Sequence, residues 1–282
     1  MKLRIASEPA HVPALQGLDE AAVDVWRDRH GAVCAWAQST DGECWMHLPG
    51  VASYRFRPGG SEVTAIRDPS AGSQLVLSGY ERTILPMAVQ LAGREVLHAS
   101  AVLAVQGVVA FCAVSATGKS TIADAFRRRG YGVWADDAVA FDAAESTVTP
   151  IALPFQNQLR PRSSRDESRV TAPALSAPRP LAADIGPLWA VCVLERATGR
   201  EAAETVRIRQ VPPAEAFPVV LAHAYCYSLD DVERNRRMIA HYLELSDRVP
   251  VFSVIFRAGL ENLPTVLEAV EREVGMAPRR SA

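Results

Sequence analysis

The chain has 282 residues, of which 49% are hydrophobic and 22% charged, a composition typical of a folded globular protein with one or two domains. Its 30 Lys and Arg residues and 32 Asp and Glu residues give a formal net charge of −2, which argues against non-specific nucleic-acid binding. The five cysteines form no pair with metal-ligand spacing, and the first residues contain no apolar signal core. We therefore expect reduced thiols, no membrane segment and a cytoplasmic location.

Short β-prone runs separated by Gly, Pro, Asp and Ser fill the first part of the chain. They lie at residues 32–36, 44–48, 53–56, 63–66 and 74–77, and a helix is predicted before them at 20–27. Such spacing is typical of an antiparallel meander. Apolar residues recur at helical spacing over 84–92, with Pro86 in the first turn. The sequence thus predicts a small, mainly antiparallel β domain of α+β type over residues 1–93.

Residues 94–282 alternate strands and helices, as expected of an α/β domain. A hairpin is predicted from strands at 101–105 and 108–114, and the second strand is apolar enough to be buried on both faces. A helix at 121–129 and a strand at 131–135 follow. Later strands are predicted at 188–194, 205–209 and 251–255, and later helices at 213–224, 232–245 and 263–274. Pro, Arg and Ser dominate residues 159–181, which predicts a mobile loop or lid.

The segment after the buried strand matches the phosphate-binding pattern G-x-x-x-x-G-K-[ST], except that Ala113 replaces the first Gly. Its residues are Ala113, Val114, Ser115, Ala116, Thr117, Gly118, Lys119 and Ser120, with Thr121 next. In such a loop, backbone N–H groups converge on phosphate oxygens at a helix N-terminus. Lys119 would pair with the β and γ phosphates of ATP, and the Ser120 hydroxyl would ligate Mg²⁺. The alternative is an ordinary strand-to-helix turn with a solvated Lys119.

Two further features are candidates for catalysis. Asp136 and Asp137 follow the strand predicted at 131–135, at the edge where open α/β sheets bind ligands. Adjacent side chains on an extended chain point to opposite sides, so one carboxylate could hold magnesium while the other accepts a proton. A solvated turn is the alternative for this pair. His98 precedes the first strand of the hairpin, and taken alone it is more typical of a packed or surface residue than of a catalyst.

Taken together, these features resemble the HPr kinase/phosphorylase superfamily, in its short bacterial form. His98 lies fifteen residues before the first loop position, and Asp136 twenty-three residues after it, as in that family. The resemblance implies a phosphoenolpyruvate-carboxykinase-like nucleotide-binding fold, with Lys119 and Ser120 at the phosphates and metal. It also implies that the two aspartates serve as metal ligand and catalytic base, beside His98. We assign the metal to Asp136 and the base role to Asp137; the reverse assignment is the alternative.

Two departures from the family pattern refine the prediction. Ala113 and Ala116 stand where the family loop carries glycine, which bears on nucleotide affinity. The E-x-R-G-x-G motif of true HPr kinases is missing, so HPr itself is not the expected substrate. Arg160 falls where short relatives carry a basic residue that could clamp a phosphate; a solvated loop arginine is the alternative.

The leading hypothesis is an ATP- and Mg²⁺-dependent kinase that phosphorylates a serine hydroxyl of a peptide or protein. Short proteins of this type in some lasso-peptide clusters phosphorylate the terminal serine of a precursor peptide, which suggests a similar acceptor. Two alternatives are a nucleotide-sensing module without turnover, which the alanines of the loop favour, and a small-molecule kinase.

Overall fold

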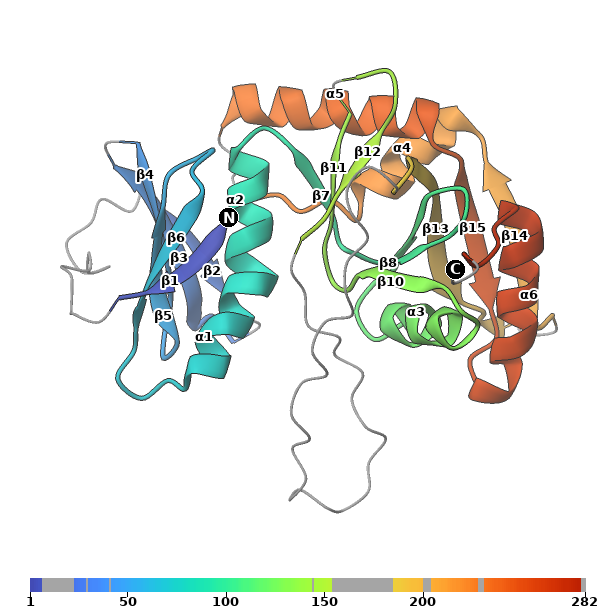
Figure 1. The fold of residues 1–282 in the computed structure, drawn as a ribbon, viewed down its shortest axis with the longest axis horizontal. Helices are drawn as coiled ribbons and strands as arrows, with labels where there is room; N and C mark the ends of the chain where they lie inside the picture. Colours follow the sequence, from blue (N-terminus) through green and yellow to red (C-terminus); the bar gives the residue numbers. More distant parts are fainter. Residues whose placement is uncertain are drawn as a thin grey trace, which may run out of the picture. The chain divides into compact units, whose positions relative to one another are not determined.

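The computed structural model describes residues 1–6, 23–28, 30–40, 42–143, 145–153, 185–199, 204–227 and 231–279. The chain divides into two compact units, each with sheet and helices (Figure 1). Unit 1 comprises Met1–Arg94 with Cys226–Asp230, and unit 2 comprises Glu95–Tyr225 with Asp231–Ala282. Within the described ranges, none of the helices combines the length and apolar character needed to span a membrane. The combination of sheets and helices confirms the α/β class predicted from the sequence.

Unit 1 is built on a six-stranded sheet in the order β1-β6-β5-β4-β3-β2. Strands β2 to β6 form an antiparallel meander, and β1 pairs with β6 in parallel. The strands are β1 (Lys2–Ile5), β2 (Val23–Arg27), β3 (Val33–Thr40), β4 (Glu43–Leu48), β5 (Ala52–Phe56) and β6 (Glu62–Arg67). The helix predicted at 20–27 is wrong for the described part of that range. Val25 and Trp26 lie on β2, where they pair with Trp36 and Ala35 of β3 in an antiparallel register.

A helical segment follows the sheet of unit 1, as α1 (Ser73–Gly79), a π-helical turn (Tyr80–Ile84) and α2 (Leu85–Leu91). The strand predicted at 74–77 is therefore wrong. Val76, Tyr80, Ile84 and Ala88 recur at four-residue spacing and are all buried, so helical burial prevails over the β propensity of the short apolar run.

Unit 2 contains a six-stranded sheet in the order β10-β8-β9-β13-β15-β14, with β9, β13 and β15 parallel. Because β8 is antiparallel to both β9 and β10, β10 runs in the direction of β9, and both strands end at the same edge. The strands are β8 (Ala99–Leu103), β9 (Val108–Cys112), β10 (Gly132–Ala135), β13 (Leu188–Arg196), β14 (Val206–Val211) and β15 (Val251–Phe256). A smaller sheet, β12-β11-β7, consists of β7 (Glu95–Leu97), β11 (Val139–Asp142) and β12 (Thr149–Ile151).

The core of unit 2 forms where α3 (Lys119–Arg128) and α6 (Leu263–Val274) pack on the six-stranded sheet. Ile122 and Phe126 of α3 and Val270 of α6 join sheet residues such as Phe111 in one buried cluster. The Phe111 and Phe126 rings stack at 5.4 Å between centroids. Helix α4 (Pro213–Leu221) contacts β13 and β15 and packs against α5 (Val232–Arg248). This core fixes α3 directly after β9.

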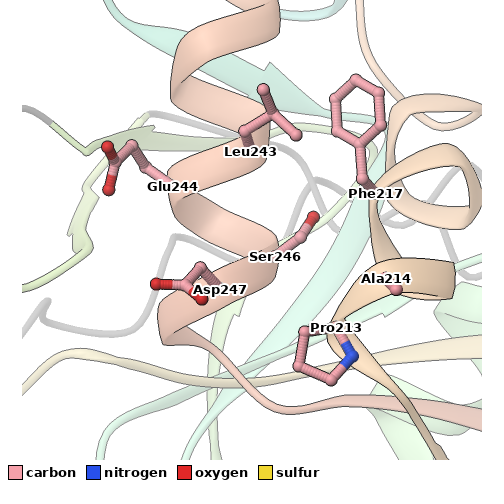
Figure 2. A pocket seen from close by; sticks show the side chains of 7 residues that line it. All are labelled: Pro213, Ala214, Phe217, Leu243, Glu244, Ser246 and Asp247. Carbon is pink, nitrogen blue, oxygen red and sulfur yellow. The ribbon is translucent and has the colours of Figure 1, made fainter.

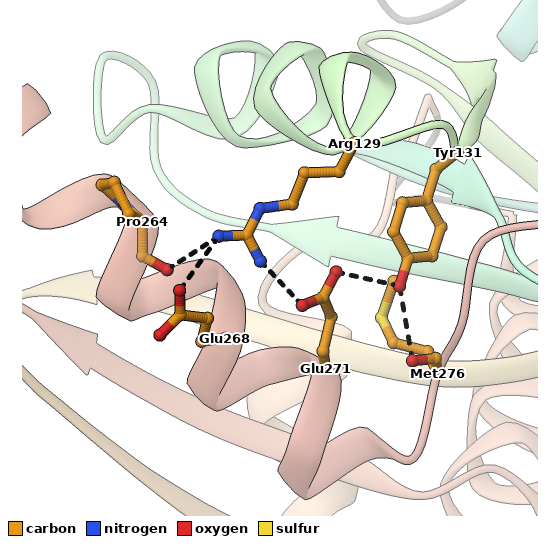
Figure 3. A network of polar contacts seen from close by, with 6 residues as sticks. All are labelled: Arg129, Tyr131, Pro264, Glu268, Glu271 and Met276. Carbon is orange, nitrogen blue, oxygen red and sulfur yellow. Dashed lines mark hydrogen bonds and ion pairs between the residues drawn. The ribbon is translucent and has the colours of Figure 1, made fainter.

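A polar network joins the end of α3 to α6 (Figure 3). Arg129 donates to Glu271 Oε2 at 2.7 Å and to the Pro264 carbonyl at 3.2 Å. The Tyr131 hydroxyl lies 3.1 Å from Glu271 Oε1 and 3.3 Å from the Met276 carbonyl. Burial and the neighbouring carboxylate raise the pKa of Tyr131, so its hydroxyl stays protonated and donates. The network connects the C-terminal end of α3, the helix that follows the candidate phosphate loop, to α6 and to Met276 after it.

Candidate functional site

The candidate phosphate loop, residues 113–118, joins the end of β9 to the start of α3. Gly118 caps the helix with φ 124°, and neither a capping side chain nor an acidic residue occupies the first turn. The first N–H groups of a helix have no intrahelical partner and favour an anion. The helix begins two residues before the prediction, which places Lys119 and Ser120 within its first turn. The first backbone N–H groups of α3 and the Lys119 side chain therefore both lie at the N-terminus of the helix.

The two alanines of the loop differ in their conformational demands. Ala113 is 1% exposed, is part of the core cluster and has no positive φ, so glycine is not required there. Ala116 has φ 67°, in the left-handed region that glycine adopts without steric penalty. Ser115 and Ala116 are exposed, and Thr117 is buried. The substitution at 116 is therefore the one that strains the loop.

Lys119 extends from the first turn of α3 into a mostly buried position, where it is 7% exposed. Its Nζ donates to the Ala113 carbonyl at 2.9 Å and contacts His98 Nε2 at 3.0 Å. Burial lowers the Lys119 pKa, while the charge of Asp137, followed by Cys112 and Asp136, opposes that shift. Lys119 is therefore a buried side chain held at the loop, and not the solvated side chain of an ordinary turn.

His98 links Lys119 to the second aspartate. Its Nδ1 lies 3.1 Å from the Asp137 carbonyl, which can only accept, so Nδ1 carries the proton. The unprotonated Nε2 then accepts from Lys119. The ring is also edge-on to Tyr225, at 5.8 Å between centroids. These contacts place a proton on Nδ1 and show that His98 is packed within the site and is not a solvated surface residue.

Asp136 directly follows β10 and is 7% exposed. Its Oδ1 accepts from Ser120 Oγ at 2.8 Å and from Ser100 Oγ at 2.7 Å. Ser100 lies on β8, between β9 and β10 in the sheet, and is fully buried. The hydroxyl and the carboxylate proposed for magnesium thus meet in the folded chain. Sequence reasoning missed Ser100, although its place two residues after His98 on a buried strand was a usable signal.

Asp137 does not continue the strand, because its φ is 71°. The expectation that the pair lies on extended chain is therefore wrong, because Asp137 adopts a left-handed backbone conformation. The Asp137 carbonyl accepts from His98 and, at 3.4 Å, from the Tyr225 hydroxyl. These two contacts hold the backbone of the turn, and among the acidic groups Asp137 has the largest effect on Lys119.

The segment after α4 completes the site with residues that sequence reasoning did not find. The His223 carbonyl accepts from the His98 N–H at 2.7 Å, and the Tyr225 N–H donates to the Val96 carbonyl at 2.9 Å. Burial, followed by the charge of Lys119, lowers the pKa of His223. No local pattern marks this histidine, because it reaches the site through tertiary packing from more than a hundred residues away.

Arg196, the last residue of β13, also contacts the candidate phosphate loop and was not predicted. It donates to the carbonyls of Ala116 and Thr117, at 2.6 and 3.2 Å. Thr121, by contrast, is exposed on α3. Arg160 and the loop predicted at 159–181 lie outside the described residues.

The residues at the site fit a magnesium ion that takes some of its ligands from the protein and the others from phosphate. The part of the chain that the structure describes has no group of three or more His, Cys, Asp or Glu residues able to hold a metal ion. Mg²⁺ in phosphoryl-transfer sites is typically held by one or two protein oxygens together with substrate phosphates and water. The Ser120 hydroxyl and Asp136 carboxylate, 2.8 Å apart, supply such a donor set.

A cavity of about 360 Å³ lies elsewhere in unit 2, between α4 and α5. Figure 2 shows Phe217 of α4 and Leu243 of α5 on facing helices, while the side chains of Glu244 and Asp247 point away from Phe217. None of its lining residues belongs to the predicted site. The convergent polar groups lie at the N-terminus of α3, so we place the candidate functional site there and not in this cavity.

Comparisons with known proteins give limited guidance. No protein-family model matches the chain, and no curated protein matches it. Among solved structures, it is similar to the Hpr(Ser) kinase/phosphatase from Coxiella burnetii, with 12% identity over 63% of this chain and 94% of that one. The TM-score of 0.32 is low. A likeness of this size does not indicate a function.

Proposed function

We propose that this chain is an ATP-dependent kinase that transfers the γ-phosphoryl group to a hydroxyl. The observation that carries the proposal is the meeting of Lys119, Ser120 and Asp136 at the N-terminus of α3, with His98 and Asp137 beside Lys119. A buried lysine, an uncapped helix start and a hydroxyl–carboxylate pair are the groups that hold a magnesium-bound triphosphate. The class of acceptor that we propose is a serine of a peptide or protein, such as the terminal serine of a lasso-peptide precursor.

Each side chain has a separate task in the proposed reaction. The first N–H groups of α3 and Lys119 bind the phosphates, and Ser120 and Asp136 hold magnesium. When bound, magnesium neutralises charge on the β and γ phosphates. His98, as the Nδ1–H tautomer, positions Lys119 through Nε2. The site thus aligns the γ-phosphoryl group by electrostatics and positioning.

Asp137 is the proposed base. As the serine Oγ forms its bond to the γ-phosphorus, the bond from that phosphorus to the β–γ bridging oxygen breaks, and ADP leaves with the bridging oxygen. The serine proton passes to the Asp137 carboxylate. Two observations support this assignment: Asp137 follows Asp136 at a left-handed turn, and its charge acts on Lys119.

A second candidate function is a nucleotide-sensing module that binds without turnover. The observation that favours it is Ala116, whose φ of 67° strains the loop and is expected to weaken phosphate binding. Retention of Lys119, His98 and both aspartates in one site favours the kinase.

Single-turnover transfer from radiolabelled ATP separates these functions. The acceptors are a peptide with a C-terminal serine, a peptide with an internal serine and a small polyol. We expect transfer to a peptide, normal MgATP affinity but no transfer in Asp137→Asn, and weakened MgATP binding in Asp136→Asn. Asp247→Asn, an exposed change on α5, is the matched control. Binding without transfer to any acceptor would favour the sensing module, and transfer to the polyol alone would identify a small-molecule kinase.

A further inference from the structure

We infer that Arg196 is a positioning residue that holds the candidate phosphate loop in its binding conformation and offsets the presence of alanine at position 116. The inference rests on the proposed function, because it concerns how the same loop binds phosphate. Strands β9 and β13 are parallel, with Val193 in register with Cys112, so Arg196 at the end of β13 lies where the loop leaves β9.

The contacts of Arg196 are directed at the loop backbone. Nη2 donates to the Ala116 carbonyl at 2.6 Å and Nε to the Thr117 carbonyl at 3.2 Å. One planar guanidinium therefore spans two successive peptide groups, a geometry that lysine cannot reproduce with its single ammonium. The contact fixes the positions of both carbonyls relative to β13.

Carbonyl direction determines the direction of the amides. In a trans peptide the C=O and the following N–H point to opposite sides, and the chain has no cis peptide bond among its described residues. With the Thr117 carbonyl facing Arg196, the Gly118 N–H faces the other way. The Thr117 N–H closes a turn onto the Val114 carbonyl at 3.3 Å. Arg196 thus orients the amide that precedes the first turn of α3.

Ala116 explains why the loop needs this support. Its φ of 67° lies in the left-handed region, which alanine disfavours and glycine adopts freely. Without the guanidinium, alanine would favour a return to negative φ, which would turn the flanking peptides out of place. A glycine at 116 would make the loop less dependent on Arg196. The two positions are therefore coupled, and the coupling can be measured.

The test compares Arg196→Ala, Ala116→Gly and the double variant with the wild type. Arg209→Ala is the matched control, because Arg209 is exposed on β14 and pairs with Glu215. The first readout needs no nucleotide: amide hydrogen exchange of residues 115–118. We expect Arg196→Ala to speed exchange by about tenfold or more, as for the loss of charge-assisted hydrogen bonds, and Arg209→Ala to leave it unchanged. Unchanged exchange in Arg196→Ala would overturn the inference.

The second readout is MgATP affinity. We expect Arg196→Ala to weaken binding by about tenfold and the added Ala116→Gly to restore most of that loss. If the double variant binds as weakly as Arg196→Ala, Arg196 is a phosphate ligand and not a positioning residue. If the wild type does not bind MgATP, the proposed function fails, while the exchange result still decides whether Arg196 holds the loop.

Discussion

Removal of the Ser100 hydroxyl tests the link between the buried strand β8 and the proposed magnesium site. Ser100 is fully buried on β8 and donates to Asp136 Oδ1 at 2.7 Å, a charge-assisted hydrogen bond to a carboxylate that is itself 7% exposed. Such a bond contributes about 1.5–3 kcal/mol. Ser100→Ala should therefore lower the free energy of unfolding by about that amount in urea denaturation followed by circular dichroism and fluorescence.

Ser246→Ala is the matched control for this change. Ser246 is also buried, and its hydroxyl donates to the neutral Tyr242 carbonyl at 2.8 Å, away from the site. The expected loss is about 0.5–1.5 kcal/mol. The two variants should differ more clearly in magnesium-dependent nucleotide affinity, since loss of a group that orients a metal ligand typically weakens affinity about 10–100-fold. Equal unfolding losses in both variants, with unchanged nucleotide affinity in Ser100→Ala, would refute the reasoning.

Three more predictions follow from pKa shifts and the α3–α6 network. Because burial lowers the Lys119 pKa below its usual value, MgATP affinity should fall as pH rises towards 10, and calorimetry should find a smaller fall in Lys119→Arg, which stays protonated. The pKa of His223 is lower in the folded chain than the unfolded value of about 6.5, so its contribution to stability is present above that value and is lost as pH falls through the folded pKa. His223→Gln should therefore flatten the decline in unfolding free energy between about pH 7 and 5. An unchanged decline would contradict this. Glu271→Gln should lower the unfolding free energy by about 1 kcal/mol in urea denaturation, because it weakens the 2.7 Å contact with Arg129. Glu268→Gln should change the unfolding free energy little, because the Glu268 contact with Arg129 is longer, at 3.4 Å, and more exposed. Equal losses in the two variants would count against the network.

Sequence patterns predicted the parts of the fold that depend on local periodicity. The apolar run that became β9 and the apolar spacing that became α3, α5 and α6 lie close to their predicted ranges. The errors at 20–27 and 74–77 fall in short runs, where strand and helix patterns differ little over one or two turns. Tertiary burial decided both, through pairing with β3 in the first and burial of Val76 in the second.

The residues of the candidate site also include some that a local motif predicts and others that only the folded chain brings together. Lys119 and Ser120 stood out because a phosphate-binding loop needs them at fixed spacing, and the structure places Ser120 against Asp136. Ser100, Arg196 and His223 reach the site through sheet register and packing, which leave no short motif. The left-handed turn at Asp137 was also beyond a pattern-based reading, since an Asp-Asp pair after a strand fits either an extended or a turned backbone.

The most direct test of the central claim is a calorimetric titration of the wild type and Ser120→Ala with ATP, in excess magnesium and in chelator. The account predicts tight binding only for the wild type with magnesium, and a loss of at least about tenfold in Ser120→Ala, because that variant removes the hydroxyl which, with Asp136, is proposed to hold the metal. Equal wild-type affinity with and without chelator, or an unchanged affinity in Ser120→Ala, would contradict it.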